Sequence, residues 1–209
     1  MLAASGGVAR VIADVANDDG RVSFDDALAL VDEIERLRAR LAEYEARVAE
    51  LDRLAHRDAL VDLPNRRSFF ANLERLIARI ERYGGEAALV FVDVDGLKAI
   101  NDRFGHNAGD QALVEVARLL MTSVRNSDFV ARFAGDEFAI LLEQSDELSA
   151  WQTALRVVEA VDDCQFCVEN VCLPLSVAVG VGVIKPGDTP QSVLARADKE
   201  MYRIKAIAP

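Results

Sequence analysis

The sequence predicts an α/β fold of the α+β type, in which helices cover a central antiparallel or mixed sheet of five strands and one long coiled-coil helix precedes it. Apolar residues repeat every three or four positions in the first quarter of the chain. A hydrophobic run at 87–95 ends in two acids, and two strand-like runs, 129–133 and 136–142, flank a two-residue turn. Such a mixture of long helices and short strands is typical of a sheet covered by helices.

The length and the net charge of the chain limit the classes of function that we expect. The chain has 209 residues, a formal net charge of −11 and 51% hydrophobic residues, which suits one folded domain with an appendage. An acidic chain has no broad electrostatic attraction for nucleic acid or anionic lipid. No apolar run approaches the ~20 residues that span a bilayer. We therefore expect a cytoplasmic protein with no nucleic-acid partner and no membrane span.

The chain carries an odd number of cysteines, Cys164, Cys167 and Cys172, in a valine-rich stretch that resembles a buried strand. Cysteine is often a small core residue, and no second cysteine pair or histidine cluster completes a metal site. We expect three reduced core cysteines in a reducing compartment, rather than a metal or redox use of Cys164 and Cys167.

A heptad pattern divides the chain. After a short N-terminal segment, 1–22, Ser23 is a candidate N-cap for a helix that continues to residue 57. Position a is Ala27, Ile34, Leu41 and Val48, and position d is Leu30, Leu37, Tyr44 and Leu51. Position a has β-branched residues at two of its four sites and position d is mainly leucine, a mixture that favours a parallel two-stranded coil. The sequence thus predicts a dimeric coiled coil at 23–57 and a second domain at 58–209.

The charged residues that flank the heptad seam favour a parallel dimer. In a parallel pair each g residue faces the following e residue of the partner helix. The three pairs all combine opposite charges: Glu33 with Arg38, Arg40 with Glu45, and Arg47 with Asp52. The alternative is a single amphipathic helix packed on its own domain, but the strict period favours dimerisation.

The elements of the second domain follow from local periodicity and turn signals. Pro64 and Asn65 form a turn before the next amphipathic pattern. Glu169 and Asn170 separate two strands within 165–183. The predicted helices are 67–83, 97–104, 111–124, 148–161 and 192–204, with a loop at 105–109.

Acidic residues meet at the predicted strand ends. Asp93 and Asp95 share one face of a strand, the Val94 carbonyl lies between them, and Asp136 and Glu137 follow the hairpin turn. If the strands are neighbours, these oxygens form a site suited to Mg²⁺. The alternative is that acids at strand ends are merely solvated, and for Asp95 alone this is as good an interpretation.

Four separate segments resemble the GGDEF family, the diguanylate cyclases. Residues 90–110 (VFVDVDGLKAINDRFGHNAGD) are similar to its signature helix and loop, and 133–138 (FAGDEF) to its namesake hairpin. The match extends to 58–67 and to 197–202, so that it covers about residues 58–205. Ala134 departs from the usual first glycine and would cost about 1 kcal/mol at a positive φ.

The resemblance implies a palm-like domain, similar to nucleotidyl cyclases, that joins two GTP molecules into cyclic di-GMP with release of pyrophosphate. Asp93, the Val94 carbonyl and Glu137 resemble the ligands of Mg²⁺, with Mn²⁺ as the other candidate. Asp136 resembles the acid that binds metal or deprotonates the attacking 3′-hydroxyl. The alternative is a catalytically weakened domain that acts as a receptor for GTP or cyclic di-GMP.

Substrate residues are also implied by the resemblance. Asn101 and Asp110 resemble the guanine-reading pair, because an amide and a carboxylate together match the guanine edge. Leu97 occupies a position where the family frequently has phenylalanine, and the resemblance implies that it contacts the substrate. The residues that resemble phosphate-binding cations are Lys199, Arg203 and, as a third, Lys98.

Two further properties follow from the same resemblance. Arg125 and Asp128, three apart and just before the hairpin, resemble the inhibitory site for the product, cyclic di-GMP. Each domain would hold one GTP, so that the reaction requires a homodimer, which the coiled coil brings together.

Overall fold

The computed structural model describes residues 24–207, which divide into two units that meet within the first described helix, at Arg53 and Leu54. The predicted segment 1–22 and the candidate cap Ser23 lie outside the described residues. No helix in the described part of the chain is long and apolar enough to cross a membrane.

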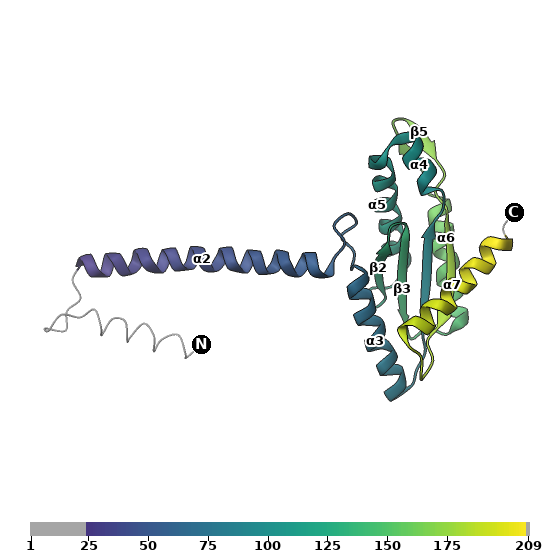
Figure 1. The fold of residues 1–209 in the computed structure, drawn as a ribbon, viewed down its shortest axis with the longest axis horizontal. Coiled ribbons are helices and arrows are strands. Elements are labelled where there is room, and N and C mark those ends of the chain that lie inside the picture. The colour runs from purple at the N-terminus through teal and green to yellow at the C-terminus, as the bar shows by residue number, and fades with distance from the viewer. Residues whose placement is uncertain (1–23, 208–209) are drawn as a thin grey trace. The chain divides into compact units, whose positions relative to one another are not determined.

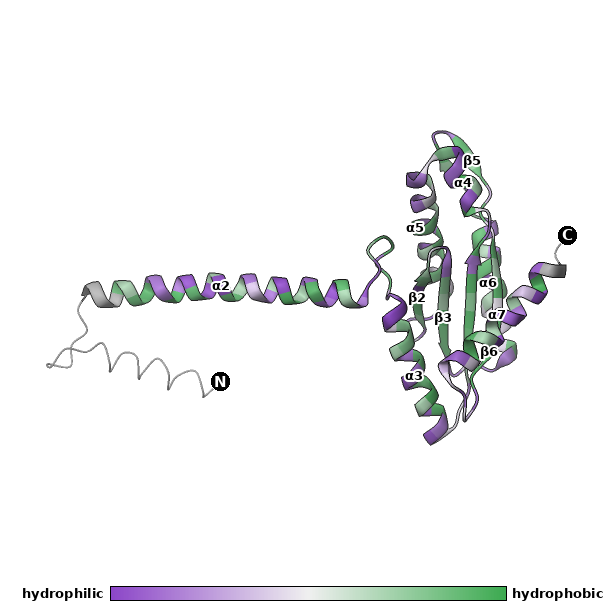
Figure 2. Ribbon diagram, in the orientation of Figure 1, coloured by the Kyte–Doolittle hydropathy of each residue, from purple (hydrophilic) through white to green (hydrophobic). Residues whose placement is uncertain are grey.

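The first helix, α2 (Phe24–His56), is continuous over 33 residues (Figure 1). Hydrophobic and hydrophilic residues alternate along the coloured part of this helix (Figure 2). The predicted a and d residues from Ile34 to Leu51 are exposed, including Leu41 at 58% and Val48 at 64%. The long helix is therefore confirmed, and its apolar seam is uncovered within this single chain. A second copy is the partner that the heptads predict.

The second domain begins with a tight turn before α3 (Arg66–Tyr83). Asn65 caps α3 by accepting a hydrogen bond from the Ser68 N–H at 3.1 Å. The Asn65 amide also donates to the Ala55 carbonyl, and the Ser68 hydroxyl donates to the His56 carbonyl at 2.7 Å. The predicted turn at Pro64 and Asn65 thus fastens the last residues of α2 to the start of α3.

The main sheet is antiparallel with strand order β2-β3-β1-β6. Its members are β1 (Ala87–Val94), β2 (Phe129–Ala134), β3 (Glu137–Glu143) and β6 (Val177–Val183). The class and the flanking helices are as predicted, but the sheet has four strands rather than five. The sequence pattern could not separate the short strands within 165–183 from the long strand that joins the sheet.

Helices cover both faces of this sheet (Figure 1). One core packs the even-numbered side chains of β1 against α5 (His106–Ser123) and α6 (Glu147–Asp162). The other packs the odd-numbered ones against α3 and α7 (Pro190–Ile207). Gly180 lets α7 lie directly on β6, because a Cβ there would come within 2.1 Å of the Ala197 carbonyl. The packing places the C-terminal end of α7 within reach of the acids at the end of β1.

A separate hairpin of β4 (Phe166–Val168) and β5 (Val171–Leu173) corrects the prediction for the cysteines. Cys167 and Cys172 are opposite each other in its register, both are exposed, and they form a disulfide. Phe166 and Val168 fill the core positions instead. Cys164 alone keeps a free thiol. The valine-rich stretch is a two-sided hairpin, so that only alternate residues face the core.

Candidate active site

The strand register brings two predicted metal ligands together. Asp93 and Glu137 are direct partners across β1 and β3, where side chains of opposed residues lie on the same face. Asp136 occupies the turn between β2 and β3, and its carbonyl accepts a hydrogen bond from the Val94 N–H at 3.0 Å. The predicted convergence of the two acidic segments is therefore present, and it follows from buried strands that cannot slip in register.

The carboxylates of this cluster repel one another. Burial raises the pKa of the Glu137 carboxyl, and the nearby charges of Asp93 and Asp136 raise it further, against an opposing effect from Arg66. A raised carboxyl pKa means that the ionised form is disfavoured without a compensating cation. The arrangement thus favours the binding of positive charge.

Lys205, which the sequence analysis did not single out, already supplies a positive charge. Its ammonium forms an ion pair with Asp93 and a second one with Asp95 at 3.2 Å. Burial lowers the pKa of Lys205, but its hydrogen bonds to Asp93 and Asp95 outweigh this effect, so that the pKa is raised. No local motif indicates this contact, because it depends on how α7 packs across the sheet.

Asp95 is less central than Asp93. Its backbone N–H donates to the Ser176 carbonyl at 3.0 Å, and its side chain is 40% exposed. The weak hydrogen bond from the Ser176 hydroxyl, at 3.4 Å, and the Lys205 ion pair are its described side-chain contacts. Asp95 is therefore partly solvated and also paired, unlike the merely solvated acid of the alternative interpretation.

The donor set fits a hard divalent cation that shares its coordination shell. Within residues 24–207, no three histidine, cysteine, aspartate or glutamate side chains form a ready-made metal site. Mg²⁺ nevertheless requires only one or two carboxylates when substrate phosphates and water complete its shell. Asp93, Glu137 and the Val94 carbonyl offer that smaller set of oxygens.

The candidate guanine-reading residues lie on adjacent helices. Asn101 is on α4 (Leu97–Phe104) and Asp110 is in the first turns of α5. The Asn101 amide lies against Gly109, since a Cβ added there would come within 2.0 Å of Asn101 Oδ1. Asp110 also borders a hollow together with Leu60 and Cys167. Leu97 is half-buried and Lys98 is exposed, both in the first turn of α4.

The structure does not bring Lys199 and Arg203 to the acids. Both side chains are exposed on α7, and Arg203 forms an ion pair with Glu200 at 2.9 Å. Ala197 and Met201 mark the buried face of α7, and Lys205 is one turn further along that face. Of the described cations on α7, Lys205 is the one that contacts Asp93.

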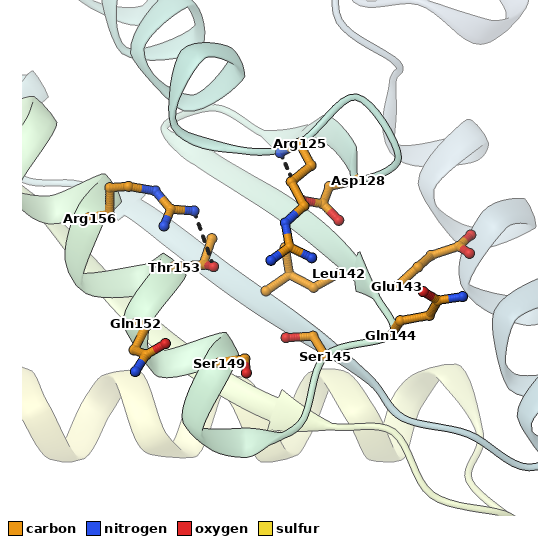
Figure 3. A pocket seen from close by; sticks show the side chains of 10 residues that line it. All are labelled: Arg125, Asp128, Leu142, Glu143, Gln144, Ser145, Ser149, Gln152, Thr153 and Arg156. Carbon is orange, nitrogen blue, oxygen red and sulfur yellow. Dashed lines mark hydrogen bonds between the residues drawn. The ribbon is translucent and has the colours of Figure 1, made fainter.

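A separate pocket contains Arg125 and Asp128 (Figure 3). The two residues close a turn, in which the Arg125 N–H donates to the Asp128 carboxylate at 2.9 Å and the Asp128 N–H donates to the Arg125 carbonyl at 3.0 Å. Arg156 on α6 lines the same pocket and donates to Thr153 and to the Ser123 carbonyl. The sequence analysis missed Arg156, because only the packing of α6 places it near this turn.

The departure at Ala134 carries no backbone penalty. Positive φ angles occur at four described non-glycine residues, and Ala134 is not among them. The turn is formed by Gly135 and Asp136, one residue later than the predicted turn at 134–135, because Ala134 is the last residue of β2. Gly135, the first residue of this turn, has φ +49° and takes the left-handed conformation. The cost considered for a methyl group at a positive φ therefore does not apply to Ala134.

Comparison with known proteins agrees with this fold. Residues 55–208 match the family model described as diguanylate cyclase, GGDEF domain. The diguanylate cyclase TpbB of Pseudomonas aeruginosa is 37% identical over 186 residues, which cover 87% of this chain and 41% of TpbB. The response regulator PleD of Caulobacter vibrioides is 35% identical over 73% of this chain and 34% of PleD. The chain belongs to the GGDEF family.

A solved structure extends the similarity to the N-terminal helix. The coiled coil and GGDEF domain of DgcB from Caulobacter crescentus, crystallised in complex with c-di-GMP, has a TM-score of 0.78 and 26% sequence identity. The match covers 85% of this chain and 95% of the crystallised DgcB chain. By contrast, this chain spans only about two-fifths of the length of TpbB.

Proposed function

We propose that this chain is a diguanylate cyclase that condenses two GTP molecules into cyclic di-GMP and releases pyrophosphate. The observation that carries the proposal is the direct opposition of Asp93 and Glu137 at the sheet end, with Asp136 in the adjoining turn. The curated relatives reported above, TpbB and PleD, include a protein named for this activity. A carboxylate cluster that requires a cation is suited to phosphoryl chemistry.

Each acid has a proposed part. Asp93, Glu137 and the Val94 carbonyl hold Mg²⁺, with Mn²⁺ as the alternative, and Asp136 binds metal or accepts the proton of the attacking 3′-hydroxyl. When bound, the metal lowers the pKa of that hydroxyl and screens the phosphates. Asn101 and Asp110 select guanine, since together they pair with donors and acceptors of its edge.

The triphosphate needs cationic partners in an otherwise acidic domain. Lys98, Lys199 and Arg203 are the proposed set, beside Leu97 on the nucleotide side. Lys205 joins them as a candidate, because its contact with Asp93 places a cation at the acid cluster. A nucleotide phosphate at this position would replace the carboxylates as the partner of Lys205.

Two copies of the chain are required. One domain offers one set of acids, and the two phosphodiester bonds of the product require two GTP molecules that face each other. The proposed division is an N-terminal segment at 1–22, a parallel coiled coil at 23–57 and a catalytic domain at 58–209. The exposed seam of α2 and the complementary flanking charges support self-association.

The pocket at Arg125 and Asp128 is the proposed inhibitory product site. An arginine fork can bind phosphate or guanine, and a carboxylate can accept hydrogen bonds from the guanine edge. Arg156 provides a second guanidinium in the same pocket. DgcB was crystallised with c-di-GMP, which supports product binding in this family.

The direct test is incubation of purified protein, freed of bound nucleotide, with GTP and Mg²⁺, followed by chromatography. We expect cyclic di-GMP and pyrophosphate from the wild type and none from Glu137→Gln, which removes a metal ligand while preserving side-chain size. A wild type that binds nucleotide but forms no cyclic product supports the receptor alternative. A full wild-type rate in Glu137→Gln removes Glu137 from the metal site.

A further inference from the structure

Arg132 connects two distant parts of the domain. It lies near the end of β2, and its side chain is only 13% exposed. Its Nε and Nη2 atoms donate to the Gly135 carbonyl at 3.0 and 2.7 Å. Its Nη1 atom donates to the Asp58 carboxylate at 3.0 Å. One guanidinium therefore holds both the turn before Asp136 and the segment that opens the domain.

The hairpin turn needs such an anchor. The β2–β3 register shifts between Arg132 and Ala134, so that Phe133 is an extra residue on β2. The Phe133 ring packs on Phe69 and Phe91. Regular ladder pairing is interrupted at such a bulge and resumes for one pair only, Ala134 with Glu137. Side-chain contacts therefore contribute to the path of the chain into Asp136.

Asp136 lies between two fixed peptide groups. The Gly135 carbonyl, which precedes it, is held by Arg132, and its own carbonyl is held by the Val94 N–H at 3.0 Å. Rotation of either peptide group would turn the Asp136 side chain relative to Glu137. The peptide group after Asp136 is bonded to Val94 at the end of β1. The Arg132 guanidinium fixes the other peptide group, the one before Asp136.

Asp58 extends the connection to the other side of the nucleotide site. Its carboxylate accepts hydrogen bonds from the Leu60 and Val61 N–H groups at 3.0 and 3.1 Å, in addition to the one from Arg132. Leu60 borders the same hollow as Asp110. One carboxylate therefore shapes the turn beside the guanine-reading residue while it holds the arginine that anchors the acidic turn.

We infer that Arg132 and Asp58 are positioning residues for catalysis, which set the acidic turn and the guanine-side turn relative to each other. The inference rests on the proposed diguanylate cyclase activity and deepens it. Neither residue contacts the reacting atoms. Their effect is on the placement of Asp136, where an error of about 1 Å lowers a rate by about a hundredfold.

Arg132→Lys tests this role. Lysine keeps a positive charge beside Asp58 but cannot donate the forked pair of hydrogen bonds to Gly135. We expect kcat to fall by tenfold or more with little change in the KM for GTP. Backbone amide exchange over 133–138, followed by mass spectrometry, should accelerate in the same variant without any nucleotide present. Asp58→Asn should show the same two changes with a smaller amplitude.

Arg196→Lys is the matched control. Arg196 also bonds to an acid, Asp188 at 2.8 Å, and to a backbone carbonyl, that of Val183, but it lies away from the acidic turn. We expect it to lower the melting temperature while kcat and the exchange of 133–138 stay unchanged. An unchanged kcat in Arg132→Lys, or equal losses in both variants, overturns the inference. If the wild type makes no cyclic product, the proposed function fails, and unchanged exchange in Arg132→Lys then overturns the anchoring role separately.

Discussion

Lys205, in the last turns of α7, forms an ion pair with Asp93, which lies 112 residues earlier at the end of β1. Asp93 is one of the two acids that face each other across the sheet, so that a helix near the C-terminus contributes directly to the acid cluster. Among the described cations of α7, Lys205 is therefore the one paired with these acids, rather than Lys199 or Arg203.

Neutralising the cations of α7 one at a time tests this assignment. We expect Lys205→Gln to raise the KM for GTP by about tenfold, because a hydrogen bond to a charged group is worth about 1.5–3 kcal/mol. Lys199→Gln and Arg203→Gln should have smaller effects, since both side chains are exposed and Arg203 is paired with Glu200. Steady-state kinetics decides the order. A larger effect of Arg203→Gln would place the triphosphate on the exposed face of α7 instead.

Gly109 sets the position of a guanine-reading residue. A methyl group at this position meets the end of the Asn101 side chain, which can move aside. Gly109→Ala should therefore raise the KM for GTP severalfold while the melting temperature changes little, because alanine favours the helix. Asn101→Ala provides the reference. Asn101 does not read the base from its present position if Asn101→Ala raises the KM for GTP while the KM of Gly109→Ala equals that of the wild type.

The sequence was sufficient where function depends on neighbouring residues. Asp93 with Val94, and Asp136 with Glu137, could each be placed at a strand end because each pair is local and both strands carry continuous apolar runs. That these two strands are neighbours was a condition of the prediction, and the register of β1 with β3 meets it. The hairpin signal then made β3 a neighbour of β2. The order of the elements predicted an antiparallel or mixed sheet with covering helices, and the structure shows the antiparallel one.

Contacts between distant elements could not be predicted. Lys205 and Arg156 enter their sites only through the packing of α7 and α6, which no local pattern specifies. The interpretation of 165–183 failed for a related reason. Valine and cysteine suit a buried strand and an exposed hairpin edge equally, and only the register pairs Cys167 with Cys172.

The coiled coil can be tested by breaking its seam. Leu37→Asp with Leu41→Asp places four charges in the predicted dimer interface, because both side chains are exposed in the single chain and would be buried in a pair. We expect monomers in light scattering and a much lower activity at submicromolar protein. The control, Ala39→Asp with Ala46→Asp, adds the same charge at f positions and should remain dimeric. An unchanged dimer in the seam variant contradicts the predicted interface.

The Asp188–Arg196 ion pair predicts a pH-dependent contribution to stability. Hydrogen bonds from Arg196 are the largest cause that lowers the pKa of Asp188, from 3.8 to about 2. A carboxyl pKa depressed in the folded state stabilises that state above the unfolded pKa, and this contribution is lost as the pH falls through the folded pKa. A pKa that is lowered by one unit corresponds to about 1.4 kcal/mol of stabilisation. Asp188→Asn should therefore lower the free energy of unfolding at pH 7 by about 2 kcal/mol.

Urea unfolding at several pH values measures this difference. The difference between the wild type and Asp188→Asn should be complete above about pH 5 and should shrink as the pH falls to 2 and below, because the wild-type carboxyl becomes protonated over this range. Glu74→Gln, an exposed neutralisation on α3, should stay within about 0.5 kcal/mol of the wild type at every pH. A gap between wild type and Asp188→Asn that persists undiminished near pH 2 would show that the loss arises from altered packing of the loop before α7 and not from the charge of Asp188.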